Sequence, residues 1–439
     1  MIKAVLLSLF SVFSLVAISQ DSPIQSGPML GYNDMREVMI WIQTVEPTDI
    51  SIDYWTVGEP ETKSSSNWVK TDRENGCVAH LVCASLEPGT AYKYSINVNG
   101  RSLAHQEGHS FETQPLWQWR MDPPAFKVVA GSCAYINEEA YDRPGKPYGG
   151  DYQIFESIAE KNPNMMLWLG DNIYLREADW GTRNGVIHRY THTRSCPEMQ
   201  NLLSTCHHYA ILDDHDFGPN DASSAFIHKD YTQEAFEMFW ANPSYGIPGV
   251  GGTTAQFQYM DVDFFLLDNR SFRTENGVKG MKETILGKEQ KKWLIQALNA
   301  STSFYKIVAI GGQFLNDVPV YENYSGYPDE RDELLELIDE NKIKGLIFLS
   351  GDRHHTELSA MTMKNGHTIY DLTSSPMTST AYDHSKEENS LRVADTHVGQ
   401  RNFSTLSFTG PLDNREVLIE VFDADGKLLW EKKLGMADF

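Results

Sequence analysis

Four short polar blocks in the sequence carry side chains that can bind metal ions. Each block directly follows an apolar run typical of a buried strand. They are Gly131-Ser132-Cys133, Gly170-Asp171-Asn172-Ile173-Tyr174, Asp213-Asp214-His215-Asp216 and Gly351-Asp352-Arg353-His354-His355. A single Gly-Asp at a strand end means little, because Asp often caps the helix that follows. Four such blocks, all rich in Asp, His, Cys or Tyr, favour a metal site over four helix caps.

The ligand types indicate which metals such a site would bind. Carboxylates bind hard cations, whereas thiolate, phenolate and imidazole groups bind transition metals. The mixture predicts more than one metal, with a carboxylate such as Asp171 bridging two cations. Two close cations can hold a hydroxide and a phosphate oxygen for in-line attack, since metal binding lowers the pKa of water from about 15.7 to about 7. The chain has neither a GxSxG nucleophile motif nor a GxxxxGK[ST] phosphate loop, which agrees with this chemistry.

Alternating strands and helices are expected to position these blocks. Short apolar runs end in Gly, Asp or Asn, and helix-like segments lie between several of them. The runs are 126–133, 165–171, 209–216, 263–270, 306–312 and 345–352, and the helical segments are 152–161, 288–300 and 330–342. Buried strands that alternate with helices predict an α/β domain. Polar residues at the carboxyl ends of its strands lie where open α/β sheets build their sites.

The segment ahead of this domain has a different pattern. Residues 38–44 and 49–55 are short β-rich runs, and 86–100 is a turn followed by an alternating strand, as in a fibronectin-like sandwich. Pro123-Pro124 marks a linker. We therefore predict a β-sandwich domain over 23–115 and a catalytic domain over 125–439. Residues 415–434 predict a closing β-hairpin that turns near Asp425-Gly426.

The first residues predict export. Lys3 is followed by an apolar stretch, and Ala17-Ile18-Ser19 offers a small-x-small cleavage site, so 1–19 is interpreted as a signal peptide. A membrane anchor is the alternative, but the stretch is short for a span. The protein is thus expected to be secreted or periplasmic, without a stable membrane span. Its net charge of -23 argues against a role in nucleic-acid binding.

Five cysteines leave at least one without an intramolecular partner in an oxidising compartment. Cys196 and Cys206 flank a short segment and could close a loop, and Cys77 and Cys83 are expected to be buried. Cys133 is left over, and it lies in one of the four polar blocks.

The blocks resemble those of a known enzyme family. GD-x-x-Y at Asp171 and Tyr174, DDHD at 213–216 and GD-x-H at Asp352 and His354 are similar to the metal blocks of calcineurin-like metallophosphoesterases. The tyrosine is typical of the purple-acid-phosphatase branch. The GSC block and LDNRSFR at 267–273 resemble PhoD-type alkaline phosphatases. The resemblance covers nearly the whole mature chain and implies an αββα sandwich preceded by a small fibronectin- or Ig-like β-sandwich.

The same resemblance implies a ferric ion paired with calcium, with zinc or manganese as second choices. Carried over residue by residue, it places four ligands around iron and two more that help complete the site. The four are Cys133, Asp171, Tyr174 and His354, with Asp171 bridging, and the two are Asp214 and Asp352. His215 would lie beside the phosphate, where it stabilises charge or protonates the leaving oxygen.

Two further residues have alternative interpretations. Gln313 stands where related enzymes often place a histidine, and its carbonyl can bind a hard metal or make a structural hydrogen bond. Arg270 can contact substrate phosphate or brace a loop through ion pairs. His355 is not assigned as a ligand, because adjacent residues point in different directions. The pair His207-His208, placed ahead of its strand, is expected to be structural or on the surface.

The leading functional prediction is an exported phosphatase that hydrolyses small phosphate monoesters at alkaline pH through a metal-activated hydroxide. The nearest alternative is phosphodiester hydrolysis, including cleavage of phospholipid headgroups, because the same metal core serves both. A secreted binding protein with a degenerate catalytic domain is a third class, against which the intact set of ligand-type residues argues.

Overall fold

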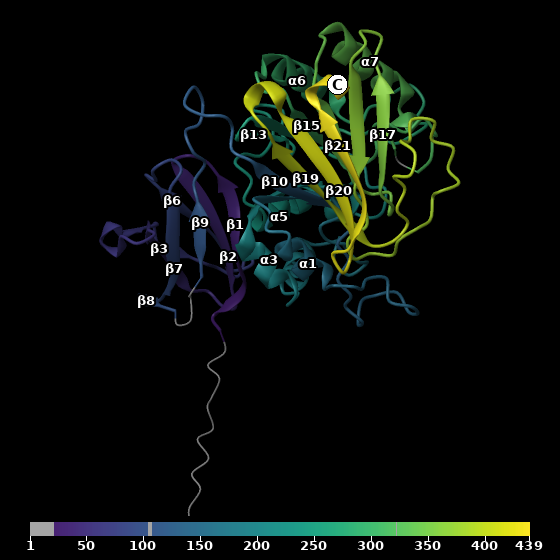
Figure 1. Ribbon diagram of the computed structural model, residues 1–439. Helices are drawn as coiled ribbons and strands as arrows, with labels where there is room; N and C mark the ends of the chain where they lie inside the picture. The colour runs from purple at the N-terminus through teal and green to yellow at the C-terminus, as the bar shows by residue number, and fades with distance from the viewer. Residues whose placement is uncertain (1–21, 104–107, 322) are drawn as a thin grey trace, which may run out of the picture.

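The computed structural model describes residues 22–103, 108–321 and 323–439 (Figure 1). The predicted signal peptide, 1–19, lies outside these residues. The described chain forms three β-sheets together with helices that cover two of them.

The largest sheet has nine strands and contains three of the four polar blocks at its strand ends. In spatial order the strands are β21 (Leu428–Gly435), β20 (Glu416–Asp423), β19 (Asn402–Thr409), β10 (Phe126–Gly131), β11 (Met165–Leu169), β12 (His207–Ile211), β1 (Ile24–Asn33), β2 (Glu37–Thr44) and β6 (Val78–Ala84). The central strands β10, β11 and β12 are parallel, and β19 to β21 are antiparallel to their neighbours. The predicted hairpin is confirmed, since β20 and β21 are joined by residues 424–427.

A second sheet of six strands carries the fourth block. Its order is β13 (Ala255–Tyr259), β14 (Val262–Leu266), β15 (Lys306–Ala309), β16 (Leu346–Ser350), β18 (Thr368–Thr373) and β17 (Glu357–Thr362). The four inner strands are parallel, and both edge strands are antiparallel. The carboxyl ends of the inner strands therefore lie at one edge of this sheet.

The two sheets pack face to face, and helices cover their outer faces (Figure 1). Alternate residues of one strand enter different cores, as a strand requires. Val128 and Ala130 of β10 lie between the sheets, and Val129 packs against the helices of its own sheet. Those helices are α1 (Ile154–Glu160), α2 (Arg183–Arg194), α3 (Met199–Thr205) and α5 (Lys229–Phe239), and the other sheet is covered by α6 (Gly287–Ala300) and α7 (Pro328–Glu340). This is the predicted αββα sandwich.

The N-terminal strands form a smaller sandwich that shares a sheet with the rest of the chain. Its own sheet contains β3 (Asp49–Thr56), β4 (Ser64–Ser65), β5 (Val69–Lys70), β7 (Ala91–Val98), β8 (Arg101–Ser102) and β9 (Ser110–Glu112). It packs on β1, β2 and β6 through one apolar core. Strand β1 also pairs in parallel with β12, with Leu30 opposite His207. The two predicted domains are thus joined through one continuous sheet.

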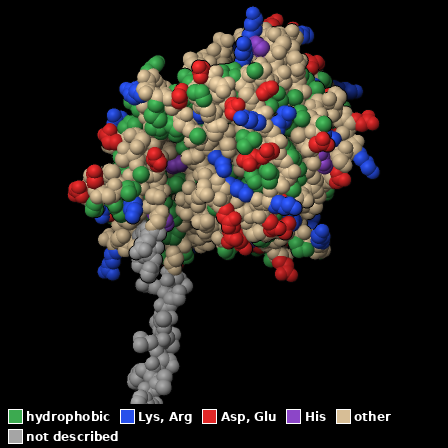
Figure 2. Space-filling model, viewed as in Figure 1, with side chains coloured by type: hydrophobic (Ala, Val, Ile, Leu, Met, Phe, Trp, Pro, Cys, Tyr) green, Lys and Arg blue, Asp and Glu red, His purple; other side chains and the backbone are tan. Residues whose placement is uncertain are grey.

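The remaining short elements are α4 (Asp214–Phe217) and 3-10 turns at Pro60–Thr62, Tyr324–Gly326, Leu412–Asn414 and Met436–Asp438. Among the residues that the structure describes, no helix combines the length and the apolar character needed to cross a bilayer. On the face drawn in Figure 2, acidic and basic side chains are interspersed over the described surface rather than gathered into one basic area.

Candidate metal centre

The strand ends of the two packed sheets bring the predicted ligands together. Cys133 follows β10, Asp171 follows β11, Asp214 follows β12, and Asp352 and His354 follow β16. Backbone hydrogen bonds tie these ends to one another. The N–H of Cys133 donates to the carbonyl of Gly170 at 3.3 Å, and the N–H of Gly351 donates to that of Gly311 at 2.6 Å.

One group of ligand atoms surrounds Asp171 on the side of Cys133. The ligand atoms of Cys133, Asp171 and His354 all lie within 4.8 Å of one another. The Tyr174 hydroxyl donates to Asp171 Oδ2 at 3.0 Å and lies 3.3 Å from His354 Nε2. The Ser375 hydroxyl donates to Cys133 Sγ at 3.1 Å. The four residues that the resemblance placed around iron are therefore in contact.

Two further groups of ligand atoms adjoin the first. Asp171, Asp214 and His215 bring their ligand atoms within 4.8 Å of one another, and so do Asp213, Asp214 and Asp352. Asp171 belongs to both the first and the second group. A carboxylate shared in this way is placed as a bridge between two cations would be.

The backbone is strained at four of the predicted ligands. Cys133, Asp171, Asp352 and His354 have φ angles of 60°, 50°, 64° and 53°, all in the left-handed region. Each such residue costs about 1–3 kcal/mol and persists only where its surroundings fix it. A Cβ added at Gly311 would approach the Asp213 carboxylate to 2.4 Å. Because this is too close for any side chain, the loop requires glycine at this position. Four of the predicted ligands thus hold a backbone conformation that L-residues rarely adopt.

A cation would stabilise the acidic side chains that are buried at the centre. Burial raises the pKa of Asp171 well above its usual range, and the nearby Asp214 and Cys133 raise it further. Its Oδ1 atom is buried without a hydrogen-bond partner. Burial also raises the pKa of the Cys133 thiol and the Tyr174 phenol. Bound cations would stabilise all three deprotonated side chains, so this donor set fits a pair of metal ions, one of them a transition metal.

Neighbouring side chains keep the Asp214 carboxyl group ionised. Burial opposes its charge, but His215 and Arg270 together hold its pKa below the usual range. Arg270 is fully buried, its Nε donates to Asp213 Oδ1, and its Nη2 lies 3.8 Å from Asp214 Oδ1. Arg270 therefore has the contacts of the loop-bracing alternative. Its predicted contact with substrate phosphate stays a prediction.

His215 lies at the edge of the centre. Its ring packs on Tyr174 with centroids 4.2 Å apart, and its Nε2 lies 3.9 Å from Asp214 Oδ2. Its side chain is 21% exposed, whereas those of Asp214 and Arg270 are nearly inaccessible. A substrate entering the centre can therefore reach His215.

Gln313 does not turn its amide toward the metal ligands. Its oxygen accepts hydrogen bonds from Asn316 Nδ2 at 2.8 Å and from Arg353 Nη1, and its nitrogen donates to Glu357 and Thr373, both at 2.9 Å. The role of Gln313 as a metal ligand therefore stays a prediction. Its carbonyl is already occupied by two donors in a buried polar network, which agrees with the structural alternative.

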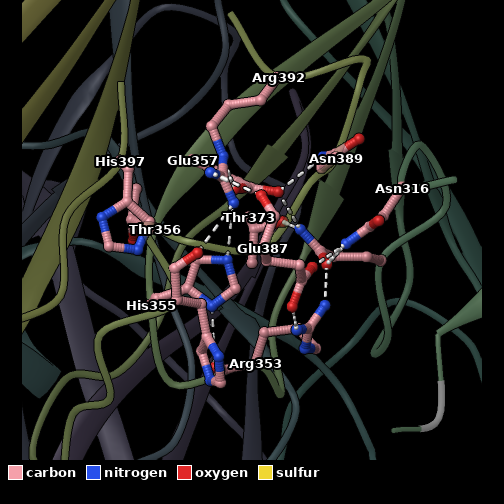
Figure 3. A network of polar contacts seen from close by, with 12 residues as sticks. Asn316, Arg353, His355, Thr356, Glu357, Thr373, Glu387, Asn389, Arg392 and His397 are labelled. Atoms are coloured by element: carbon pink, nitrogen blue, oxygen red, sulfur yellow. Dashed lines mark hydrogen bonds and ion pairs between the residues drawn. The ribbon is translucent and has the colours of Figure 1, made fainter. Parts of the chain in front are cut away.

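Figure 3 shows this polar network, which includes Arg353 and His355 from the loop after β16. Arg353 pairs with Glu387 at 2.7 Å, and His355 Nε2 lies 3.5 Å from Glu357 Oε2. Asp352 and His354 enter the metal groups, while the intervening Arg353 and the following His355 enter the network. Adjacent residues thus point in different directions, as expected, and His355 is not in the ligand groups.

The pair His207-His208 and the cysteines are buried. His207 and His208 lie within β12 rather than ahead of it, and both are buried. All five cysteines are unpaired and buried, so the structure contains no Cys196–Cys206 bridge.

Three features of the centre were missed in the sequence. Asp213 joins a ligand group and anchors Arg270, a role that the doubled Asp-Asp could have signalled. Ser375 contacts the Cys133 thiol from a strand end about 240 positions away, and nothing in the sequence marks it. Tyrosine rings also surround the centre, with Tyr148 and Tyr135 packed around Tyr174.

Comparison with known proteins agrees with this arrangement. Residues 252–415 match the model of a family described as PhoD-like phosphatase, and residues 21–116 match a domain of unknown function, DUF7800. This part of the chain is thus similar to the PhoD-like phosphatases. The chain is 22% identical over 346 residues to alkaline phosphatase D of Bacillus subtilis (strain 168), a match that covers 67% of this chain and 55% of that protein.

The fold of this chain is shared by solved structures. A structure of PhoD superposes with a TM-score of 0.75 at 16% identity, covering 94% of this chain and 92% of the other. A purple acid phosphatase from yellow lupin seeds gives a TM-score of 0.69 at 12% identity, covering 92% and 73%. The PhoD-like phosphatases are phosphoric ester hydrolases, and the matched structures confirm the metallophosphoesterase fold.

Proposed function

We propose that this protein is an exported phosphatase that hydrolyses phosphate monoesters at a centre of two metal ions. The observation that carries the proposal is Asp171. Its carboxylate belongs to two ligand groups at once, and one of its buried oxygens has no hydrogen-bond partner. The match to the PhoD-like phosphatase model and the similarity to alkaline phosphatase D support a phosphoric ester as the substrate.

Cys133, Asp171, Tyr174 and His354 would hold a ferric ion, and Asp214 and Asp352 would help hold calcium beside it. A phenolate and a thiolate favour a transition metal, and a group of carboxylates favours a hard cation. When bound, the cations would activate a water molecule and neutralise charge on the phosphate.

His215 would act on the reacting oxygens. Contact with the Tyr174 ring orients its imidazole, and Asp214 lies close to its Nε2. From this position His215 would stabilise the phosphate charge or deliver a proton to the leaving oxygen. The buried Arg270 would keep Asp214 ionised and ready for metal by balancing its charge.

Export is proposed from the apolar stretch and the small-x-small site within residues 1–19. Sequencing the N-terminus of protein collected outside the cytoplasm would test it. A start near Gln20 is expected, and an intact Met1 in the exported fraction would contradict cleavage.

The activity is tested with purified protein loaded with iron and calcium, zinc or manganese. Hydrolysis of a monoester and a diester with the same leaving alcohol is measured with and without calcium. We expect the monoester to be preferred and calcium to be required. Preference for the diester would support phosphodiester hydrolysis instead, and absence of both activities with every metal would refute the proposal.

A further inference from the structure

A row of aromatic rings leads from the metal centre to the surface. Tyr382 lies nearest the centre, with its ring centroid 5.3 Å from that of His354. The N–H of Tyr382 donates to the carbonyl of His354 at 3.0 Å, so the same loop geometry fixes ligand and ring. His384 comes next, 6.3 Å from Tyr382, and Tyr321 follows 5.7 Å further along.

The two tyrosines of this row are unusually exposed for residues so well fixed. Tyr382 is 46% exposed and Tyr321 is 72% exposed. Arg353 lies over the Tyr321 ring, with its guanidinium carbon 5.2 Å from the centroid, and His384 meets the same ring at 70°. Rings held in place from behind offer preorganised apolar surface to a flat ligand.

The charges nearby limit what this ligand can be. Arg353 is paired with Glu387, and Arg392 is paired with Glu357, so carboxylates already neutralise both guanidinium groups behind the row. The chain also carries a net charge of -23. A leaving group with further phosphates would therefore find little positive charge here to balance its own negative charge. A neutral leaving group with an aromatic ring has no such charge to balance.

We infer that Tyr382 and Tyr321 form a stacking site for the leaving group of the substrate, and that the preferred esters are phosphates of alcohols bearing a planar ring, such as nucleoside monophosphates. This inference rests on the proposed phosphatase function and specifies its substrate class. A nucleobase suits the site because each base presents a flat π face that stacks on tyrosine.

The test compares adenosine 5′-phosphate with ribose 5-phosphate. Both esters release a primary alcohol at the same sugar carbon, so they differ in the base. The readout is the ratio of their kcat/KM values for the metal-loaded full-length protein. We expect a wild-type ratio of about 5 to 150 in favour of the nucleotide, the range that stacking of one base provides.

Substitutions test whether the aromatic row causes this ratio of kcat/KM values. Tyr382→Leu and Tyr321→Leu should each lower it at least about threefold, and Tyr382→Phe should retain it, because the ring rather than the hydroxyl stacks. Tyr231→Leu is the matched control, since Tyr231 is a 39% exposed tyrosine on α5, and it should leave the ratio unchanged. Metal content is measured for each variant, because Tyr382 contacts the ligand His354.

The outcomes separate the two levels of the proposal. Equal kcat/KM values for both esters in the wild type would overturn the stacking site and leave the phosphatase proposal standing. A high ratio that both leucine variants retain would also overturn it. Hydrolysis of neither ester by metal-loaded protein would overturn both.

Discussion

Replacing Asp171 by Asn should have opposite effects on the stability of the metal-free protein and of the metal-loaded protein. In the metal-free protein the Asp171 carboxylate is buried beside Asp214, whose pKa is held low and which is therefore ionised. The amide has nearly the same shape without the charge. Asp171→Asn should accordingly stabilise the metal-free protein and destabilise the metal-loaded protein, because a bridging ligand is lost.

The magnitude follows from the spacing of the ligand groups. Ligand atoms of Asp171 and Asp214 lie within 4.8 Å of one another. Two charges at that distance repel by about 3 kcal/mol at an effective dielectric constant of about 20. Asp171 escapes part of this cost by binding a proton, since its pKa is raised by burial and by Asp214. A gain of about 1–3 kcal/mol is therefore expected, and in a chain of 439 residues this raises Tm by about 1–3 °C.

Thermal unfolding of both proteins, freed of metal by chelation and then reloaded, measures the effect. Metal present at about 1,000 times its Kd should add about 4 kcal/mol to the wild type and much less to the variant. Tyr174 and Cys133 donate hydrogen bonds to Asp171 Oδ2, and the amide oxygen can still accept them. If Asp171→Asn lost the same stability with and without metal, Asp171 would be a structural hydrogen-bond acceptor, and the bridging role would be wrong.

Other substitutions test the remaining assignments. His215→Ala should lower kcat about 10²–10⁴-fold while keeping both metals. Elemental analysis compares it with Asp171→Ala, which should lose metal, and equal loss in both variants would identify His215 as a ligand. Tyr174→Phe should remove a visible charge-transfer band that ferric iron gives the wild type, and a colourless, fully active zinc enzyme would contradict the iron assignment. Cys133 should be a free thiolate on metal, so disulfide mapping of active protein should find it unbridged, and a Cys133 disulfide there would exclude it as a ligand. Gln313→Ala should retain full metal content but unfold at a lower temperature, because it breaks four buried hydrogen bonds. Loss of one metal at unchanged Tm would instead identify Gln313 as a ligand.

The sequence indicated the candidate ligands because each block is contiguous and follows an apolar run. Parallel strands of one sheet bring their carboxyl ends to one edge, so Asp171 and Asp214, which follow β11 and β12, could be placed together without knowledge of the loops. Gln313 could not be assigned in this way. Its partners Arg353 and Glu357 come from a different strand end and a different strand, and only their packing decides where its amide points.

The N-terminal region shows the same limit at a larger scale. Its strands were predictable from alternation, and its linker from two prolines. The pairing of β1 with β12 was not, because hydrogen bonds between backbones leave little trace in side-chain patterns. The tyrosines around the centre were also hidden, since loops such as 135–150 carry no periodicity.

The shared sheet has a consequence for how the protein can be divided. A fragment starting at the linker would leave β12 as an open edge, with unpaired N–H and C=O groups along a strand whose residues are all buried in the intact chain. Such an edge pairs readily with other chains, which leads to aggregation. Gene fusions or truncations that separate the two regions at their linker would thus cut through a continuous sheet.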